Sequence, residues 1–209
     1  MDTPTRNLET FEWMAGHPAL DFTNTVSWMS AGHPDYLHGY ADLLAWAGKA
    51  GLIGEQGRRA LSQGSEQAQA TAFRQAQALR ESLRTIFQAL AEGRGPPQAA
   101  LDRLSSVVQK TAVWRRLSLV GFKVRSDWNF AGAPPSALLG PIAWKAVELL
   151  ENGPLERVKE CHPGCTWLFL DTSRNGSRRW CSMQTCGNEA KVRRFRKRLK
   201  AGAVAKQGV

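Results

Sequence analysis

The sequence predicts an α+β fold, in which a mostly α-helical N-terminal domain with a small antiparallel β-hairpin is followed by a compact ββα module. Three observations predict this class. Apolar residues recur every three or four positions over much of residues 1–150, which is the period of an amphipathic helix. The stretch 113–130 changes to the alternating period of β-strands. Every cysteine of the chain then falls within one short segment, 161–186.

The helices of the first domain follow from this period and from the residues that begin and end it. The longest has apolar residues at every third or fourth position from Ala72 to Leu90. Gly51 is a suitable C-terminal cap for the helix before it. Ser136 can cap the last helix, and Asn152-Gly-Pro154 closes it and marks the domain boundary. We expect helices over 17–28, 40–50, 66–92 and 97–111, and from Ser136 to the closing Asn152.

Residues 113–130 predict the one sheet of this domain. Large apolar side chains recur there at the spacing of a strand, and Gly121 lies between the two runs and favours a turn. We therefore expect two antiparallel strands joined near Gly121. They carry Trp114, Leu117, Leu119, Phe122, Val124, Trp128 and Phe130.

The cysteines form a two-plus-two pattern: Cys161 and Cys165, then fifteen residues, then Cys181 and Cys186. Zn²⁺ prefers four tetrahedral ligands, and two short loops with a cysteine at either end bring four sulfurs together. A reducing cytosol favours thiolates over disulfides. The pattern predicts a structural Zn²⁺ on these four residues, with a redox dithiol or an iron–sulfur site as the alternatives. A catalytic zinc is disfavoured because four protein thiolates leave no coordination position for water.

Between the cysteine pairs the sequence predicts a β-hairpin. Residues 166–170 form its first strand, Asn175-Gly176 is a turn signal, and residues 177–180 form the returning strand. A helix over about 188–200 follows the last cysteine, which makes the zinc module treble-clef-like. Because so small a unit has almost no core of its own, zinc binding is expected to supply most of its folding free energy. The expected domains are residues 1–152 (helical), 153–201 (zinc module) and 202–209 (flexible tail).

The net charge of +10 is concentrated in the second part of the chain. Residues 151–209 hold 13 of the 28 Lys and Arg but only five of the 18 Asp and Glu, so they carry +8 while residues 1–150 carry +2. Such asymmetry points to a polyanionic partner, nucleic acid before membrane. An apolar stripe of Val192, Phe195 and Leu199 is expected to pack on the hairpin and to leave the basic side chains facing outward. The residues expected to bind nucleic-acid phosphates are Arg174, Arg178, Arg179, Lys191, Arg193, Arg194, Arg196, Lys197, Arg198 and Lys200.

Two parts of the chain resemble known families. Residues 158–200 contain the motifs Cys161-x3-Cys165-x-Trp167-x-Phe169-x-Asp171-x-Ser173-Arg174 and Arg178-Arg179-Trp180-Cys181-x-Met183-x2-Cys186-Gly187-Asn188 with Lys191. This part of the chain resembles the CGNR zinc-finger family. The first 150 residues contain Leu20-Asp21-Phe22-x-Asn24-Thr25 and Tyr40-x2-Leu43-Leu44-x-Trp46-Ala47. They resemble the ABATE domain, which precedes this finger in bacterial proteins regarded as stress-induced transcription regulators.

The resemblance implies zinc on the four cysteines, DNA binding by the basic helix, and regulation of transcription. One residue departs from the motif, since Glu189 stands where the family has the arginine of its name. A carboxylate in the first turn of a helix suits the helix dipole, and Glu189 is four residues before Arg193, with which it can pair.

We therefore expect a zinc-stabilised DNA-binding protein and not an enzyme, with double-stranded DNA as its partner. It is expected in the cytoplasm, associated with the nucleoid and not with a membrane. The opening residues lack the pattern of a secretion signal, and no apolar run approaches the roughly 18 residues that span a bilayer. Palindromic DNA sites require a dimer, so we expect a homodimer formed through the helical domain.

A small-molecule effector is also expected, because polar residues interrupt an apolar stretch near the start of the chain. Asp21, Asn24, Thr25 and Trp28 are the candidate effector pocket. Two other functions remain open at this point. The chain can be an RNA-binding protein, or an enzyme whose basic zinc module only docks it on nucleic acid.

Overall fold

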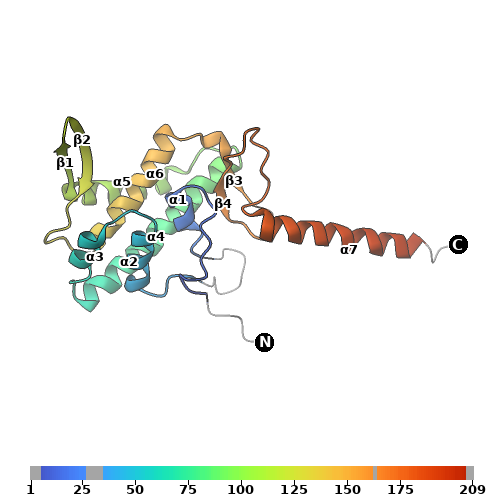
Figure 1. The fold of residues 1–209 in the computed structure, drawn as a ribbon, viewed down its shortest axis with the longest axis horizontal. Coiled ribbons are helices and arrows are strands. Elements are labelled where there is room, and N and C mark those ends of the chain that lie inside the picture. Colours follow the sequence, from blue (N-terminus) through green and yellow to red (C-terminus); the bar gives the residue numbers. More distant parts are fainter. Residues whose placement is uncertain (1–5, 27–34, 162–163, 206–209) are drawn as a thin grey trace.

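The apolar helix faces meet in one core, as the computed structural model shows (Figure 1). The structure describes residues 6–26, 35–161 and 164–205. The longest helix, α4, runs through the body and contacts α1, α2, α5 and α6. Its inward side chains, among them Leu79, Leu83 and Phe87, are at most 2% exposed. The helices are α1 (Pro18–Thr23), α2 (Tyr40–Lys49), α3 (Glu55–Leu61), α4 (Glu66–Ala91), α5 (Gln98–Thr111), α6 (Leu139–Asn152) and α7 (Asn188–Ala205).

Helices α2, α4 and α5 confirm the predicted ranges. Gly51, with φ of +70°, follows α2 in the left-handed conformation that glycine adopts most easily. Ser65 caps α4 by accepting a backbone N–H with its hydroxyl. The prediction missed α3 because Leu61 is its one buried residue, so its sequence shows no apolar face. Ser136 does not cap α6, since it lies inside the 3₁₀ turn η2 (Pro135–Leu138) that leads into that helix.

The first helix is shorter than predicted. The hydroxyls of Thr23 and Thr25 each donate to the backbone carbonyl three residues earlier, at 2.8 Å, and the chain then leaves the helix. Val26 pairs with Asp35 as an isolated β-bridge. Residues 27–28, which the prediction placed in this helix, lie outside the described residues.

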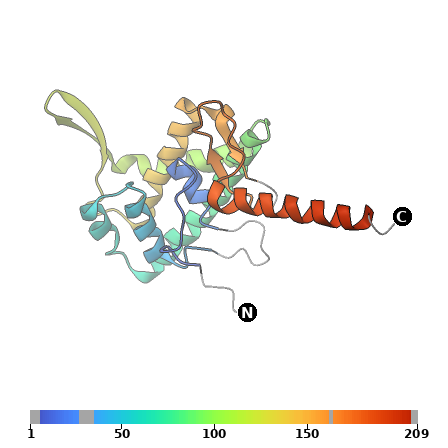
Figure 2. The same ribbon diagram turned by 45° about the vertical axis from the view of Figure 1, so that its right-hand side comes forward.

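The predicted hairpin of the helical domain is confirmed. Strands β1 (Arg115–Val120) and β2 (Lys123–Trp128) pair antiparallel, and Gly121 has the positive φ (+61°) that the turn needs. The hairpin projects from the body next to α5 and α6 (Figure 2). Most of its apolar side chains are therefore outside the core: Leu117 and Leu119 are 76% and 73% exposed, and Phe122 at the tip is fully exposed, whereas Trp128 at the base packs against the core.

A second small hairpin opens the zinc module, but its strands differ from the prediction. β4 (Leu168–Leu170) lies within the expected first strand, whereas its partner is β3 (Val158–Glu160), which precedes the cysteines. Residues 177–180 form no strand, and the amino group of Lys159 donates to the carbonyls of Gly176 and Arg178 in this part of the chain. With two antiparallel hairpins, a helical first part and the cysteine-rich module, the α+β class is confirmed.

Helix α7 leaves the module and extends away from the body (Figures 1 and 2). It continues to Ala205, so residues 202–205, expected in a flexible tail, are helical. Within the described part of the chain, no helix combines the length and the apolar character needed to cross a bilayer.

Candidate metal centre and basic helix

The four cysteines converge on one point. Their Sγ atoms all lie within 4.8 Å of one another, and Cys181 Sγ is 3.6 Å from the Sγ atoms of both Cys165 and Cys186. None of the four is in a disulfide. Thiolates at about 2.3 Å from one tetrahedral ion stand about 3.8 Å apart, so the observed spacing fits a single metal ion with four sulfur ligands.

Two turns of different kinds present these ligands. In the first, the backbone N–H of Cys161 donates to the carbonyl of Trp167 at 2.8 Å, which closes the loop between β3 and β4. Thr166 takes a left-handed conformation there, with φ of +58°. In the second, residues Met183–Gly187 form a π-helical turn that begins with a cap from Ser182 and leads directly into α7. Cys186 lies in that turn, so the position of the fourth cysteine sets the start of the helix.

The electrostatics of the cluster favour a bound cation. Interaction with the neighbouring Cys161 thiol raises the pKa of Cys165 to about 12, and it also raises the pKa of Cys181. Burial raises the pKa of Cys186. Four thiols this close cannot all ionise unless a positive charge compensates them, which a divalent ion does. All four positions around such an ion are protein sulfurs, so the arrangement suits a structural site and offers no position for water or substrate.

The segment between the two turns is held by a buried carboxylate. Asp171 is fully buried and accepts hydrogen bonds from the amino group of Lys159 (2.7 Å), the hydroxyl of Ser173 (2.6 Å) and the backbone N–H of Arg178 (2.9 Å). Burial alone raises the pKa of a carboxyl group, but these donors outweigh it and hold the pKa of Asp171 well below its usual range. Asp171 thus orders the loop that connects β4 to Cys181.

The structure gives Arg178 a different role from the one predicted. Its guanidinium donates to the carbonyls of Trp180 (2.9 Å), Met14 (3.1 Å) and Cys181, and it stacks over the ring of Phe169 with 4.7 Å between the guanidinium carbon and the ring centroid. Through these contacts the Arg178 side chain joins the loop that carries Cys181 to the N-terminal segment at Met14. We correct the prediction that Arg178 belongs to a nucleic-acid surface.

The zinc module is joined to the helical body through buried polar side chains. Arg84 of α4 donates to the carbonyl of Thr166 and to the carboxylate of Glu160, each at 2.5 Å. Asn24 pairs with the backbone of Leu168, donating to its carbonyl (2.8 Å) and accepting its N–H (3.0 Å). The prediction missed Arg84, although an arginine on the apolar face of an otherwise regular helix is a signal that the sequence contains.

The module also shares the hydrophobic core of the helical domain. Leu168 and Phe169 are fully buried, and Val158 is 2% exposed, in the same cluster as α1, α4 and α6. We expected the module to have almost no core and to depend mainly on the metal for its folding. The structure corrects this expectation, because packing on α1 and α4 supplies part of the stabilisation.

The candidate effector residues near the start of the chain bond to the protein itself. The Asp21 carboxylate accepts the backbone N–H of Ala15 at 3.0 Å, and Thr25 accepts a hydrogen bond from Arg80 at 2.8 Å. Asn24 bonds to the backbone of Leu168, so all three side chains have hydrogen-bond partners within the protein, and all three are almost entirely buried. Trp28 lies outside the described residues. This geometry assigns structural roles to the three residues, and none of them lines the cavity described below.

Asp21 gives a pH-dependent prediction. Burial raises the pKa of this carboxyl group to about 6, despite backbone hydrogen bonds that lower it. The folded state therefore binds more protons than the unfolded state between about pH 4 and pH 6, and this residue makes stability fall as pH rises through that window. In urea unfolding, the free energy of unfolding of Asp21→Asn, measured relative to that of the wild type, should increase by about 2 kcal/mol between pH 4 and pH 7. Both proteins carry the same cysteines, so acid release of metal affects them equally. A constant difference across this range would contradict the prediction.

The first part of helix α7 exposes its basic residues. Residues 191–196 are all exposed, including Lys191, Arg193, Arg194 and Arg196, and Lys197, Arg198 and Lys200 follow in the same helix. Arg174 and Arg179 are exposed on the preceding loop.

The first two residues of the predicted apolar stripe of α7 do not pack as predicted, and the side chain of Leu199, the third, lies outside the described part of the chain. Val192 and Phe195 are 48% and 62% exposed, because α7 projects from the module and does not lie across the hairpin. Glu189 is exposed in the first turn of α7, as expected.

Two family models match the chain, in the order that the sequence indicated. ABATE, described as "Putative stress-induced transcription regulator", matches residues 16–153, and the CGNR zinc finger matches residues 157–199. No curated protein sequence matches the chain. The first model covers more than half of the chain and the second covers the converging cysteines. The chain therefore belongs to the ABATE family and carries a CGNR zinc finger after its ABATE domain.

Proposed function

We propose that this protein is a zinc-stabilised DNA-binding regulator of transcription, and that α7 is the element that contacts DNA. The observation that carries the proposal is the exposed basic surface of α7, on a helix that projects from the body (Figure 1). The helix contains seven Lys and Arg and one acid, Glu189. A charge of this size on a protruding element favours a polyanion with a groove that can receive it.

The dimensions of α7 support duplex DNA. Its 18 residues span about 27 Å, and the major groove of B-DNA, about 12 Å wide, admits an α-helix. Lys and Arg side chains along such a helix neutralise backbone phosphates and release counterions, which supplies affinity that falls steeply with salt. Arg174 and Arg179, exposed on the loop before α7, extend the positive surface toward the body.

We assign Zn²⁺ as the metal on Cys161, Cys165, Cys181 and Cys186. The four sulfur donors within 4.8 Å suit one soft, tetrahedral ion, and the family is a zinc-finger family. When bound, the ion neutralises thiolate charge and ties the turn that starts α7 to the β3–β4 loop. On this proposal the ion orients the DNA-binding helix and takes no part in a reaction, and the protein acts in the cytoplasm at the nucleoid.

The proposal is tested by selecting bound sequences from a pool of random duplex DNA, with competition by single-stranded and hairpin RNA. We expect enrichment of a duplex sequence and weak competition by RNA. Stronger binding of RNA than of duplex DNA would contradict the proposal and support the RNA-binding alternative. Binding of duplexes without any enrichment would contradict the regulatory role.

A homodimer is part of the proposal, and the β1–β2 hairpin supports it. Leu117, Leu119 and Val124 share one face of the hairpin and are each at least 69% exposed. A two-stranded hairpin with an exposed apolar face is marginal in water by itself and is stabilised when the face is covered. A second copy is the occupant that the DNA-binding role favours, because a twofold axis places two α7 helices on one palindromic site.

Substitutions in this hairpin test the dimer. The double variant Leu119→Ser, Phe122→Ser should sediment as a monomer at concentrations where the wild type sediments as a dimer. Ser118→Ala, on the opposite face of β1, is the matched control and should remain dimeric. A wild type that is monomeric at high micromolar concentration would rule out this part of the proposal.

A further inference from the structure

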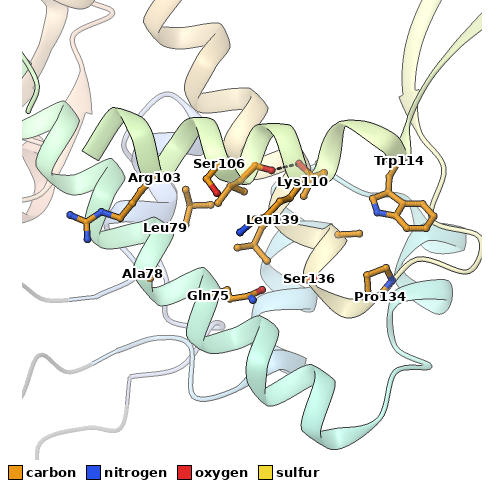
Figure 3. Close-up of a pocket in the computed structure, with 13 residues that line it drawn as sticks. Gln75, Ala78, Leu79, Arg103, Ser106, Lys110, Trp114, Pro134, Ser136 and Leu139 are labelled. Atoms are coloured by element: carbon orange, nitrogen blue, oxygen red, sulfur yellow. Dashed lines mark hydrogen bonds between the residues drawn. The ribbon is translucent and has the colours of Figure 1, made fainter. Parts of the chain in front are cut away.

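A cavity of about 300 Å³ lies between α4, α5 and the turn η2, at the base of the β1–β2 hairpin (Figure 3). Its walls are mainly apolar, from Leu79 on α4, Val107 on α5 and Leu139 on α6. Trp114 and Pro134 close one end, where the chain enters and leaves the hairpin. The volume is at the lower end of the range, about 300–1,000 Å³, of pockets that bind small molecules.

The charged groups of this cavity are of one sign. Arg103 and Lys110 are its ionisable lining residues, and no acidic side chain lines it. The two are seven residues apart on α5, about two helical turns, and so lie on the same side of the helix. Figure 3 shows Lys110 extending from α5 over the cavity, with Arg103 at the outer end. Among the residues that the structure describes, neither side chain has an ion-pair partner.

Neutral polar groups complete the lining. Gln75 on α4, Ser106 on α5 and Ser136 in η2 lie around the apolar walls and offer hydrogen-bond donors. Apolar walls with a cation and a few donors at the edge match a ligand that has an apolar body and one anionic group. A cationic ligand would meet Lys110 and Arg103 without any compensating acid.

We propose that this cavity binds a small amphipathic organic anion, an aryl or alkyl carboxylate, with its apolar part between Leu79 and Leu139 and its carboxylate at Lys110. The charge-assisted hydrogen bond to the ammonium fixes the orientation, and the apolar contacts provide most of the affinity. The site is separate from Asp21, Asn24 and Thr25, which bond to the protein itself.

The position of the cavity connects it to the zinc module. Leu79 lines the cavity, and Arg84, five residues further along α4, binds Thr166 and Glu160 of the module. A ligand that displaces α4 by binding beside Leu79 therefore acts on the helix that holds the metal-binding loop. This regulatory consequence rests on the proposed DNA-binding function, whereas binding of the anion does not.

The test uses the full-length, metal-loaded protein and two matched probes in ¹⁹F NMR titrations. 4-Fluorophenylacetate carries the proposed anion, and 4-fluorophenethylamine carries a cation on a ring of the same size. We expect the acetate to bind and the amine to bind at least about tenfold more weakly, since a hydrogen bond to a charged group is worth about 1.5–3 kcal/mol. Equal binding of both probes, or no binding of the acetate at millimolar concentration, would overturn the proposal.

Variants place the probe in the cavity. Lys110→Gln should weaken the binding of 4-fluorophenylacetate about tenfold. Ala78→Trp should abolish this binding, because the indole fills the space beside Leu79. Lys49→Gln, on α2, is the control for loss of one positive charge and should bind as the wild type does. Melting temperatures confirm that each variant is folded. Unchanged affinity in Lys110→Gln would contradict the assignment even if the acetate binds.

A titration of DNA in the presence and absence of the acetate then tests independently whether the bound anion changes the affinity for DNA.

Discussion

Alanine at Lys191, Arg194 and Arg196 together should weaken the binding of duplex DNA about 100-fold near physiological salt. Each phosphate contact contributes about 0.9 to the slope of log affinity against log salt. At 0.15 M salt this corresponds to a factor of about five in affinity per contact, relative to 1 M salt. All three side chains are exposed on α7 and none supports the fold, so the variant should unfold at the wild-type temperature. Fluorescence anisotropy with a labelled duplex measures the effect.

The control for this variant removes the same charge from the body. Lys49, Arg59 and Arg74 are exposed on α2, α3 and α4, and their replacement by alanine changes the net charge equally. This control should lower affinity by much less, through the long-range field alone. If both triple variants lose the same affinity, net charge and not α7 explains DNA binding.

Replacing Cys181 by serine should remove the metal and most DNA binding while leaving the helical body folded. Cys181 is 1% exposed and its Sγ is 3.6 Å from two other ligands, so serine cannot restore the site. Three sulfurs hold zinc far more weakly than four, and the turn that starts α7 then loses its fixed position. We expect metal content near zero and at least about tenfold weaker DNA binding.

The structure also predicts which part of the protein stays folded in Cys181→Ser. Asn24 and Arg84 hold β4 and the β3–β4 loop on the body independently of the metal, and Leu168 is buried among α1 and α4. Hydrogen exchange should therefore increase in residues 181–187 and stay slow in α4. Thr185→Ser, in the same turn, is the control and should retain metal. Global unfolding of Cys181→Ser would contradict the shared core as a source of stability.

The sequence predicted the helical elements well where the pattern is strong. α4 has apolar residues at every third or fourth position and a serine cap, and Gly51 follows the end of α2, so periodicity and end signals located both helices. α3 has neither, since its one buried residue is Leu61. The convergence of the four cysteines was predictable for a similar reason, because short spacings between cysteines leave few arrangements of four sulfurs. The family matches confirm the two resemblances, to the ABATE domain and to the CGNR zinc finger, in the predicted order.

The elements that were predicted wrongly depend on contacts distant in sequence. The partner of β4 is β3, which precedes the cysteines, and Lys159 of β3 also bonds to the Asp171 carboxylate that follows β4; no local turn signal reveals this pairing. Asn24 was predicted to line an effector pocket because it is one of the polar residues that interrupt an apolar stretch, but its partner is Leu168, 144 residues away. Arg178 is a basic residue of the zinc finger, yet its guanidinium donates to the backbone of the cysteine-bearing loop. Charge in the sequence does not distinguish such residues from those on the surface of α7.

The central claim is that the metal centre orients α7 to bind duplex DNA, and the salt dependence of affinity tests it most directly. Anisotropy titrations of the wild type over a range of salt concentrations are compared before and after removal of the metal by a chelator. We predict a slope of log affinity against log salt of about −4 to −6 for the metal-loaded protein, from four to seven phosphate contacts, and a slope smaller by at least about 2 after chelation. An identical slope and affinity with and without the metal would contradict the claim.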